Sequence, residues 1–338
     1  MALEINSYHD PSGFEVLATE WNDLLHRSAA DTIFLTLEYQ RTWWQHLGGG
    51  EILILGLRDD GELVGIAPLL VKTEPQGQRA VTFIGCVEVA DYLDFVVARE
   101  REEEVYAALL DFLASPRAPA WDVLDLCNIH QDSPTLSILP GLAKARGWAI
   151  STVKDDVCPV VRLPGTWEEY LQMLDGKERH ELRRKLRRAA SLPALNWYIV
   201  SRQHDLEAEF EEFLNLMAAS TPDKAAFLTP QMRNFFRHLA REAYEAGWLQ
   251  LAFLEIGQQK AAAYFNFVYN NRVLVYNSGL DWRTFPQVGA GIILMAYCIR
   301  HAIEQGREVF DFMQGSERYK YQFGGQDMEV RRLLVRRG

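Results

Sequence analysis

A polar segment near the C-terminus carries the side chains best suited to acid–base chemistry. Residues 311–325 read DFMQGSERYKYQFGG and come at the end of a predicted strand, where polar groups of α/β sheets commonly face a ligand. Glu317 and Asp311 are candidate bases for an attacking amine, and Tyr319 is a candidate acid for a leaving thiolate. Lys320 could bind a phosphate or stabilise an oxyanion. The alternative is an ordinary surface loop.

A glycine-containing turn precedes the apolar helix predicted over residues 290–305. Gly289 and Gly291 flank Ala290 at this turn, and glycine lets backbone N–H groups approach a ligand closely. The N-terminus of a helix also carries a partial positive charge, which favours anions. The turn therefore suits a pyrophosphate, unless the glycines serve packing alone.

A strongly basic helix is predicted over residues 177–190, with the sequence KERHELRRKLRR at 177–188. Arg179, Arg183 and Arg187 are four residues apart and fall on one row of the helix. Like charges at this spacing destabilise a helix by a few tenths of a kcal/mol per pair. The row therefore favours an anionic partner, either acidic side chains or a phosphate-bearing ligand. A solvated helix face is the alternative.

A second acidic cluster, DYLDF, occupies residues 91–95 in the first half of the chain. Its two carboxylates lie three residues apart around Tyr92, at the start of a predicted strand. Tyr92 and Asp94 are therefore candidates to line a substrate cleft. The alternative is a strand that begins with solvated acids.

Composition and missing motifs exclude several classes of protein. The 338 residues carry 35 Lys and Arg against 46 Asp and Glu, a net charge of −11, so non-specific attraction to nucleic acid or anionic lipid is not expected. The sequence has no GxSxG elbow, no GxxxxGKS/T phosphate loop, no HExxH and no GxGxxG after a strand. Paired Cys and His spacings are also missing, so no metal is expected.

The four cysteines are widely spaced, which favours buried free thiols in a reducing cytoplasm. The N-terminus lacks a basic region followed by an apolar one, so no signal peptide is expected. The longest apolar run, from Val288 to Ile299, is shorter than the ~20 residues needed to span a bilayer. We therefore expect a cytoplasmic protein without a membrane span.

The chain reads as two similar halves, each an α/β unit with a mixed sheet. Residues 53–70 and 251–268 both read as strand, tight turn and strand, which suggests a degenerate duplication; the alternative is that any two hairpins look alike. Thr166 and Glu169 form a capping box before a helix at 167–175. The expected domains are 1–160 and 161–338. Further helices are expected at 14–26, 34–47, 101–114, 134–146, 205–219 and 231–246.

The layout resembles the CelD/BcsL-type acetyltransferases of the GNAT superfamily, which are relatives of the FemA/FemB/FemX peptidoglycan aminoacyltransferases. The resemblance covers nearly the full chain, and its most specific motif is FDFMQGSERYKYQFG at 310–324. The other matching segments are Trp21–Leu24, Phe34 with Trp43–Trp44, Gly61–Leu69, Asp91–Asp94, the arginine-rich helix and Tyr276–Gly279.

The resemblance implies two tandem GNAT folds and acyl transfer from a thioester, usually of coenzyme A, to an amine. The helix that opens at Gly289 would lie under the pyrophosphate, although Pro286 takes the first position of the R/Q-x-x-G-x-G/A loop. Fem-type relatives carry a lysine that matches Lys320 and assists acyl transfer or substrate binding. These implications assign the N-terminal domain to the acceptor side or to a structural role, and the C-terminal domain to the acyl donor.

We expect an N-acyltransferase that moves an acyl group, most simply acetyl from acetyl-CoA, to an amine of a small molecule, sugar or cell-envelope precursor. One alternative is a Fem-like ligase that uses aminoacyl-tRNA, the only case in which nucleic acid would bind. Another is a non-catalytic GNAT-like module in a polysaccharide pathway. The candidate donor-binding residues are Val288, Gly289, Ala290, Gly291, Asn277 and Ser278. The candidate substrate-binding residues are Asp94, Tyr92, Arg183, Arg187 and Tyr276.

Overall fold

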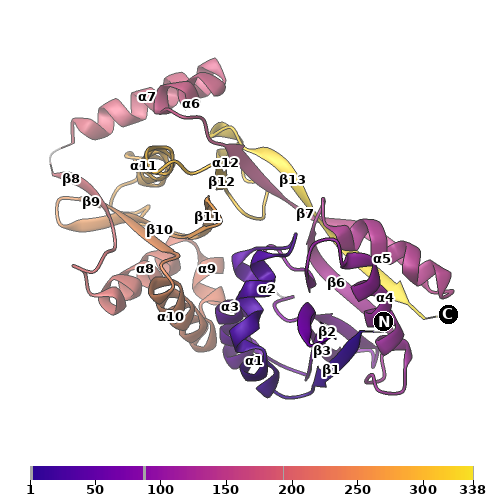
Figure 1. The fold of residues 1–338 in the computed structure, drawn as a ribbon. Helices are drawn as coiled ribbons and strands as arrows, with labels where there is room; N and C mark the ends of the chain where they lie inside the picture. The colour runs from indigo at the N-terminus through magenta and orange to yellow at the C-terminus, as the bar shows by residue number, and fades with distance from the viewer. Residues whose placement is uncertain (1–2, 87–88, 193, 338) are drawn as a thin grey trace. The chain divides into compact units, whose positions relative to one another are not determined.

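A computed structural model describes residues 3–86, 89–192 and 194–337 (Figure 1). The chain folds into two compact units: unit 1 is Met1–Val157 with Met328–Gly338, and unit 2 is Cys158–Asp327. Two strands, β7 (Ala149–Arg162) and β13 (Gln326–Arg336), run from one unit into the other. The end of the chain, which the sequence analysis placed in the second domain, therefore belongs to unit 1.

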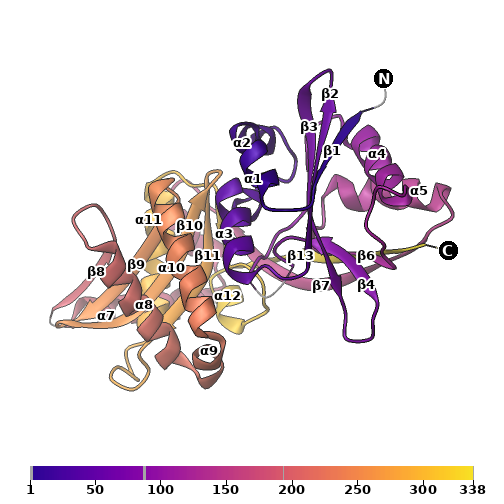
Figure 2. The same cartoon turned by 90° about the horizontal axis from the view of Figure 1, so that it is seen from below.

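Unit 1 is a mixed sheet with helices on both faces. Figure 2 shows the first three α-helices on one side of its strands and α4 and α5 on the other. Its strands follow the order β1 (Glu4–Tyr8), β2 (Glu51–Asp59), β3 (Glu62–Thr73), β4 (Arg79–Phe83), β6 (Val123–His130), β13, with β5 (Val96–Val97) against β3. Its helices are α1 (Ser12–Val16), α2 (Ala18–His26), η1 (Ile33–Leu35), α3 (Leu37–Leu47), α4 (Glu102–Ala114) and α5 (Pro134–Ala145).

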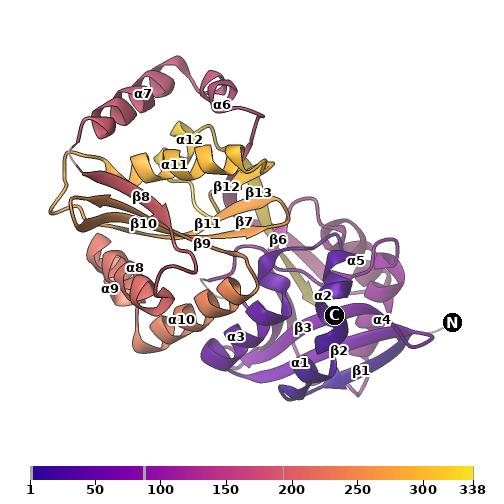
Figure 3. The same ribbon diagram turned by 60° about the vertical axis from the view of Figure 1, so that its left-hand side comes forward.

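Unit 2 has the same kind of mixed sheet, with α8 and α10 on one face and α11 on the other, and with α7 packed beyond α11 (Figure 3). Its strands follow the order β7, β12 (Val309–Asp311), β11 (Arg272–Leu280), β10 (Gln259–Tyr269), β9 (Leu249–Ile256), β8 (Leu195–Ile199). Its helices are α6 (Trp167–Met173), α7 (Gly176–Ala190), α8 (Leu206–Ser220), α9 (Pro222–Phe227), α10 (Pro230–Glu245), α11 (Ala290–Glu304) and α12 (Arg318–Gln322).

The two units repeat one topology, which confirms the predicted α/β fold class with mixed sheets. In unit 1 the antiparallel strands β2, β3 and β4 are followed by α4 and then by β6, which pairs parallel to β4. In unit 2 the antiparallel strands β9, β10 and β11 are followed by α11 and then by β12, parallel to β11. The last strands are exchanged: β13 pairs with β6, and β7 pairs with β12.

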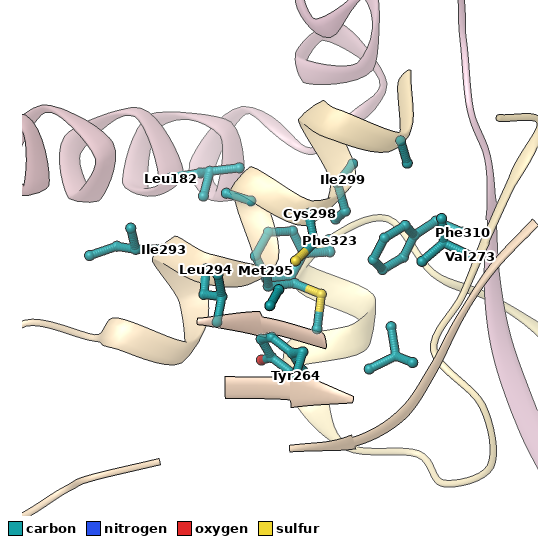
Figure 4. Packing of buried hydrophobic residues seen from close by; sticks show 14 of the residues in the cluster. Leu182, Tyr264, Val273, Ile293, Leu294, Met295, Cys298, Ile299, Phe310 and Phe323 are labelled. Carbon is teal, nitrogen blue, oxygen red and sulfur yellow. The ribbon is translucent and has the colours of Figure 1, made fainter. Parts of the chain in front are cut away.

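Helix α11 is apolar on nearly all sides because the sheet covers one side of it and α7 covers the other. Figure 4 shows Leu294, Met295 and Cys298 of α11 between Leu182 of α7 and Tyr264 of β10. A helix that is hydrophobic all round belongs in an interior, and close packing there fixes its position. The core of unit 2 therefore holds the N-terminus of α11 firmly against the sheet.

The expectation of four free cysteines is wrong for one pair. Cys86 and Cys127 form a disulfide across a sequence separation of 41 residues, whereas Cys158 and Cys298 are buried free thiols. The two bonded residues come from separate segments of unit 1, so no local spacing in the sequence marks them as partners.

The carboxylate of Asp94 is a buried part of unit 1. It accepts hydrogen bonds from the Ser133 hydroxyl, from the Thr135 hydroxyl at 2.5 Å and from the Phe95 backbone N–H at 2.8 Å. The side chain is only 5% exposed, and burial raises its pKa to about 6 despite these hydrogen bonds. Asp94 therefore fixes local structure in unit 1, and its assignment to substrate binding stays a prediction.

The raised pKa of Asp94 predicts a pH dependence of stability. The folded state binds the proton more tightly than the unfolded chain, whose value is near 3.8, so stability falls as the pH rises through the window from about 4 to about 6. The loss is up to about 3 kcal/mol, since one pH unit corresponds to about 1.4 kcal/mol. We expect urea unfolding at pH 4.5 and pH 7 to show a smaller difference for Asp94→Asn than for the wild type. Parallel pH profiles would contradict this.

Candidate functional site

The sheet of unit 2 opens between β11 and β12. These parallel strands pair only from Arg272 to Leu274 against Val309 to Asp311, yet β11 continues to Leu280 along β10. The chain after Asp311 turns away because Met313 adopts a left-handed conformation with φ of 61°. The edge of β11 near Ser278 is therefore left facing a pocket rather than a neighbouring strand.

A pocket of about 770 Å³ lies at this opening within unit 2. Its walls come from β10, β11, the loop after β11, the start of α11, α9, α7 and the residues at the start of α12. The sequence-predicted residues that line it are Ser278, Val288, Gly289, Gly291, Glu317 and Tyr319. Candidate phosphate-binding and acid–base residues thus meet in one cavity.

The N-terminus of α11 opens into the pocket through a glycine. Gly289 caps the helix with φ of 71° and ψ of 43°, a left-handed conformation that disfavours residues with a Cβ. The first N–H groups of a helix have no partner within it, and no acidic residue lies in the first turn of α11. A Cβ built on Gly289 would lie 3.7 Å from the Lys185 Nζ, so a cation stands beside these donors.

The corresponding helix of unit 1 is unsuited to an anion. The first turn of α4 carries Glu102, Glu103 and Glu104, whose charges oppose a phosphate at a helix N-terminus. This contrast favours unit 2 as the unit that carries the anion site.

Helix α7 presents a different face to the pocket from the one predicted. Arg184, Lys185 and Arg188 line the cavity, whereas Arg183 pairs with Glu168 at 2.8 Å and Arg187 does not line it. The helix turns this way because Leu182 and Ala189, the two residues that α7 buries in the core, set its rotation. The sequence identified the basic helix but not which of its rows faces inward.

Lys320 is a buried residue whose hydrogen bonds hold the loop before α12 together. Its Nζ donates to the carbonyl oxygens of Met313 at 2.9 Å, Gln314 at 2.6 Å and Gly315 at 3.0 Å, and it pairs with the Glu317 carboxylate at 2.9 Å. The side chain is 2% exposed and does not line the pocket. Its geometry is that of a residue that positions Glu317.

Asp311 supports the same loop from the end of β12. Its carboxylate is fully buried and accepts the Met313 backbone N–H at 2.8 Å. That hydrogen bond helps to hold Met313 in its left-handed conformation, which costs a residue with a Cβ of the order of 1–2 kcal/mol. Asp311 therefore shapes the loop from a position outside the pocket.

Glu317 and Tyr319 have complementary acid–base properties. The carboxylate of Glu317 is 58% exposed and reaches the pocket. Burial and the nearby Glu317 charge raise the pKa of Tyr319 above its ordinary value, so the phenol stays protonated near neutral pH. Burial also raises the pKa of the neighbouring Tyr264. The Tyr264 hydroxyl donates a hydrogen bond to the Gly291 carbonyl at 3.3 Å. One wall therefore offers both a proton acceptor and proton donors.

Lys224 is a pocket residue that the sequence analysis missed. It lies on α9, and its Nζ donates to the Ser278 carbonyl at 2.6 Å and to the Ser278 hydroxyl at 3.0 Å. Burial lowers its pKa, while the charge of Glu317 acts in the opposite direction. A single lysine in the polar segment 220–230 gives no signal in the sequence; only the approach of α9 to β11 reveals it.

The remaining predicted residues lie outside the pocket. Ala290 is buried in the first turn of α11, and Asn277 lies opposite Phe265 on β11. Tyr276 packs among aromatic rings of the other sheet face. Tyr92 belongs to unit 1, where its ring contacts His130. Their assignment to ligand binding stays a prediction.

Neither a metal cluster nor a membrane-spanning helix occurs in the described part of the chain. No group of three or more His, Cys, Asp or Glu side chains is placed to hold a metal ion within ranges 3–86, 89–192 and 194–337. In the same ranges no helix combines the length and apolar character required to cross a bilayer.

The fold is similar to that of several known proteins. Residues 176–321 match the family model described as an acetyltransferase (GNAT) domain. The crystal structure of FemX is similar with a TM-score of 0.68 and 12% identity, over 97% of this chain and 96% of that one. A tandem GNAT protein from the clavulanic acid biosynthesis pathway gives 0.51 and 12%, over 98% of each chain.

The C-terminal domain of a putative lysylphosphatidylglycerol synthetase from Agrobacterium fabrum gives a TM-score of 0.56 with 13% identity, over 96% of this chain and 92% of that one. A comparison with curated protein sequences gives no match. The chain therefore has the Fem-like tandem GNAT fold that the sequence resemblance implies.

Proposed function

We propose that unit 2 is an N-acyltransferase that takes an acyl group from a coenzyme A thioester and passes it to an amine. The observation that carries the proposal is the pocket that joins the N-terminus of α11 to Glu317 and Tyr319. One end of this cavity suits phosphates and the other suits proton transfer. Acetyl transfer, as in the CelD/BcsL-type resemblance, is the simplest form of the reaction.

The phosphate end fits a pyrophosphate on charge and on shape. Gly289 leaves space at the helix N-terminus, and the N–H groups of residues 289–292 would bind its oxygens. Lys185 beside Gly289 adds a full positive charge. A bound thioester supplies an activated carbonyl, and the open edge of β11 near Ser278 is where its arm would lie.

The other end of the pocket handles protons and charge. Glu317 accepts a proton from the incoming ammonium, and the free amine then attacks the thioester carbonyl carbon. As the C–N bond forms and the C–S bond breaks, the protonated Tyr319 donates its proton to the departing sulfur, and the second proton that the nitrogen loses restores the phenol. Lys224 uses two of its three N–H donors on Ser278 among the described residues, which leaves one for a carbonyl oxygen that gains negative charge. The roles of Glu317 and Tyr319 are those predicted from the sequence, and the role of Lys224 is a further proposal that its contacts with Ser278 support.

Replacement of Gly289 by valine tests the phosphate end. We expect Gly289→Val to weaken acetyl-CoA binding at least tenfold, because each charge-assisted hydrogen bond contributes about 1.5–3 kcal/mol and tenfold corresponds to about 1.4 kcal/mol. Gly247→Val is the matched control: Gly247 is exposed, has φ of 76° and has no atom within 4 Å of a built Cβ. Both variants should lose stability similarly by calorimetry, but only Gly289→Val should lose affinity. Equal affinities would contradict the proposed site.

A Fem-like ligase that uses aminoacyl-tRNA is the second candidate. The observation that favours it concerns Arg179 and Arg187 on α7, which lie outside the pocket and have no side-chain partner among the described residues. They form a local concentration of positive charge in a chain whose net charge is −11. These residues would contact a polyanion larger than a nucleotide. Tight tRNA binding that weakens steeply with salt, together with no turnover of acyl-CoA, would replace the first proposal by this one.

A further inference from the structure

We propose that Lys224 is a site of self-acylation: when no acceptor amine is present, its Nζ takes the acyl group from the bound thioester, and the enzyme becomes blocked. This modification rests on the proposed function, because the acyl group comes from the same donor. Lys224 lines the pocket together with Ser278, beside which the thioester arm is proposed to lie. The chain therefore holds an amine of its own close to the place where the acceptor amine reacts.

The position of Lys224 is fixed by close packing between β11 and the end of α8. A Cβ built on Gly279 would lie 2.6 Å from the Met217 backbone nitrogen, so only a glycine lets α8 come this close to the strand. The Ser220 hydroxyl accepts the Leu280 backbone N–H at 2.7 Å, and α9 follows directly in the chain. These contacts hold Lys224 against β11.

The hydrogen bonds of Lys224 leave its nitrogen open in one direction. Nζ lies 2.6 Å from the Ser278 carbonyl oxygen and 3.0 Å from the Ser278 hydroxyl. A neutral amine has two N–H donors and one lone pair, and the contacts with Ser278 use both donors. The lone pair is then left for the carbonyl carbon of a thioester. The ammonium form has a third N–H in its place, so one geometry supplies an oxyanion donor when charged and a nucleophile when neutral.

The surroundings of Lys224 favour the neutral form. Both contacts of its nitrogen are with uncharged groups, and no carboxylate forms an ion pair with it among the described residues. Burial lowers its pKa, and the charge of Glu317 offsets this only in part. By contrast, Lys185 in the same pocket lies 3.9 Å from the Glu181 carboxylate. Lys224 is therefore the better nucleophile of the two.

The reaction forms one amide and releases one thiol. The first proton of the Lys224 ammonium passes to the carboxylate of Glu317, another residue of the pocket. As the bond from Nζ to the carbonyl carbon forms and the C–S bond breaks, the second proton that the nitrogen loses reaches the departing sulfur through Tyr319. An amide is a far poorer acyl donor than a thioester, and acylation removes the positive charge of the lysine. The modified enzyme therefore stays inactive.

The test is incubation of the purified protein with acetyl-CoA and no acceptor, followed by peptide mapping with mass spectrometry. We expect acetylation of Lys224 to be at least about tenfold faster than that of Lys177, because binding brings the reacting atoms together. Lys177 is exposed, lies outside the pocket and has no partner among the described residues, so it reports the background reaction in solution. An excess of coenzyme A should slow the acetylation of Lys224 but not that of Lys177.

Two variants connect the modification to the pocket and to activity. Below saturation with donor, Gly289→Val should slow acetylation of Lys224 about tenfold, in line with its weaker donor binding, and leave Lys177 unchanged. Preincubation of the wild type with acetyl-CoA alone should lower kcat in step with the acetylated fraction of Lys224. Whatever its starting activity, Lys224→Arg should show no such time-dependent loss, because arginine is not deprotonated in proteins.

Equal rates of acetylation at Lys224 and Lys177 would overturn the self-acylation. So would an unmodified Lys224 in a protein that transfers acetyl groups to an added amine, a result that would leave the acyltransferase proposal standing. A protein that shows neither a thermal shift with acetyl-CoA nor selective acetylation would overturn both proposals. Selective acetylation of Lys224 that coenzyme A suppresses would support the modification, even before an acceptor amine is identified.

Discussion

Replacement of Lys320 by methionine is expected to lower the free energy of unfolding by about 3 kcal/mol or more, because it removes the donor from three carbonyl groups and from Glu317. The Lys320 side chain is 2% exposed, so water cannot readily take its place. Methionine keeps the length of the side chain and offers no N–H group. Urea unfolding, followed by circular dichroism, measures the difference.

The neighbouring Arg318 provides the control for this variant. Its side chain is exposed and has no partner among the described residues, so Arg318→Met should change stability by no more than about 0.5 kcal/mol. Equal stabilities of the two variants would contradict a stabilising role for the hydrogen bonds and ion pair of Lys320. If Lys320→Met is the less stable variant, its loss of activity, corrected for the folded fraction, reports the displacement of Glu317. It does not report the loss of a catalytic amine.

Replacement of Glu317 by glutamine is expected to lower kcat for acyl transfer by about 10²–10⁴-fold, the usual contribution of a positioned general base. KM for the donor should change little, because the phosphate end of the pocket does not involve Glu317. Glutamine retains an oxygen that can accept from Lys320, so the fold should persist. Steady-state kinetics with a fixed amine separate the two parameters.

A half-buried glutamate on α7 offers a matched control for this substitution. Glu178→Gln changes a carboxylate that does not line the donor pocket, and it should leave kcat within about twofold of the wild type. A Glu317→Gln variant that behaves in the same way would show that another group accepts the proton.

Local patterns made much of the fold predictable. The DG turn between β2 and β3 formed as expected, with Asp60 and Gly61 at positive φ. Thr166 caps α6 by accepting the Glu169 N–H at 3.2 Å, and its hydroxyl donates to the Glu169 carboxylate at 2.9 Å. Gly289 takes the left-handed conformation that a glycine permits. Such features depend on a few adjacent residues, so they can be predicted directly from the sequence.

Tertiary placement was less predictable, because it depends on residues far apart in the chain. Lys320 was assigned to chemistry from its neighbours in the sequence, but burial turned it toward backbone carbonyls. Lys224 enters the pocket only because α9 lies beside Ser278, which is 54 residues away in the chain. The Cys86–Cys127 disulfide likewise joins separate segments.

The rotation of α7 is the most instructive difference. Several rows of basic residues satisfy the helical spacing equally well, and the sequence analysis selected the row of Arg183 and Arg187. The choice is made by Leu182 and Ala189, which are buried and so direct Arg184, Lys185 and Arg188 to the cavity. Apolar residues on a charged helix are therefore a better guide to its inward face than the charges are.

The most direct test of the account is a thermal-shift titration of the purified protein with coenzyme A and acetyl-CoA. A ligand that binds only the folded state adds about 2.7 kcal/mol at 100 times its dissociation constant, which moves the unfolding midpoint by a few degrees. The account predicts a saturable rise with both compounds. An unchanged midpoint at millimolar concentrations of both would contradict it, and would leave the turn at Gly289 as a packing feature.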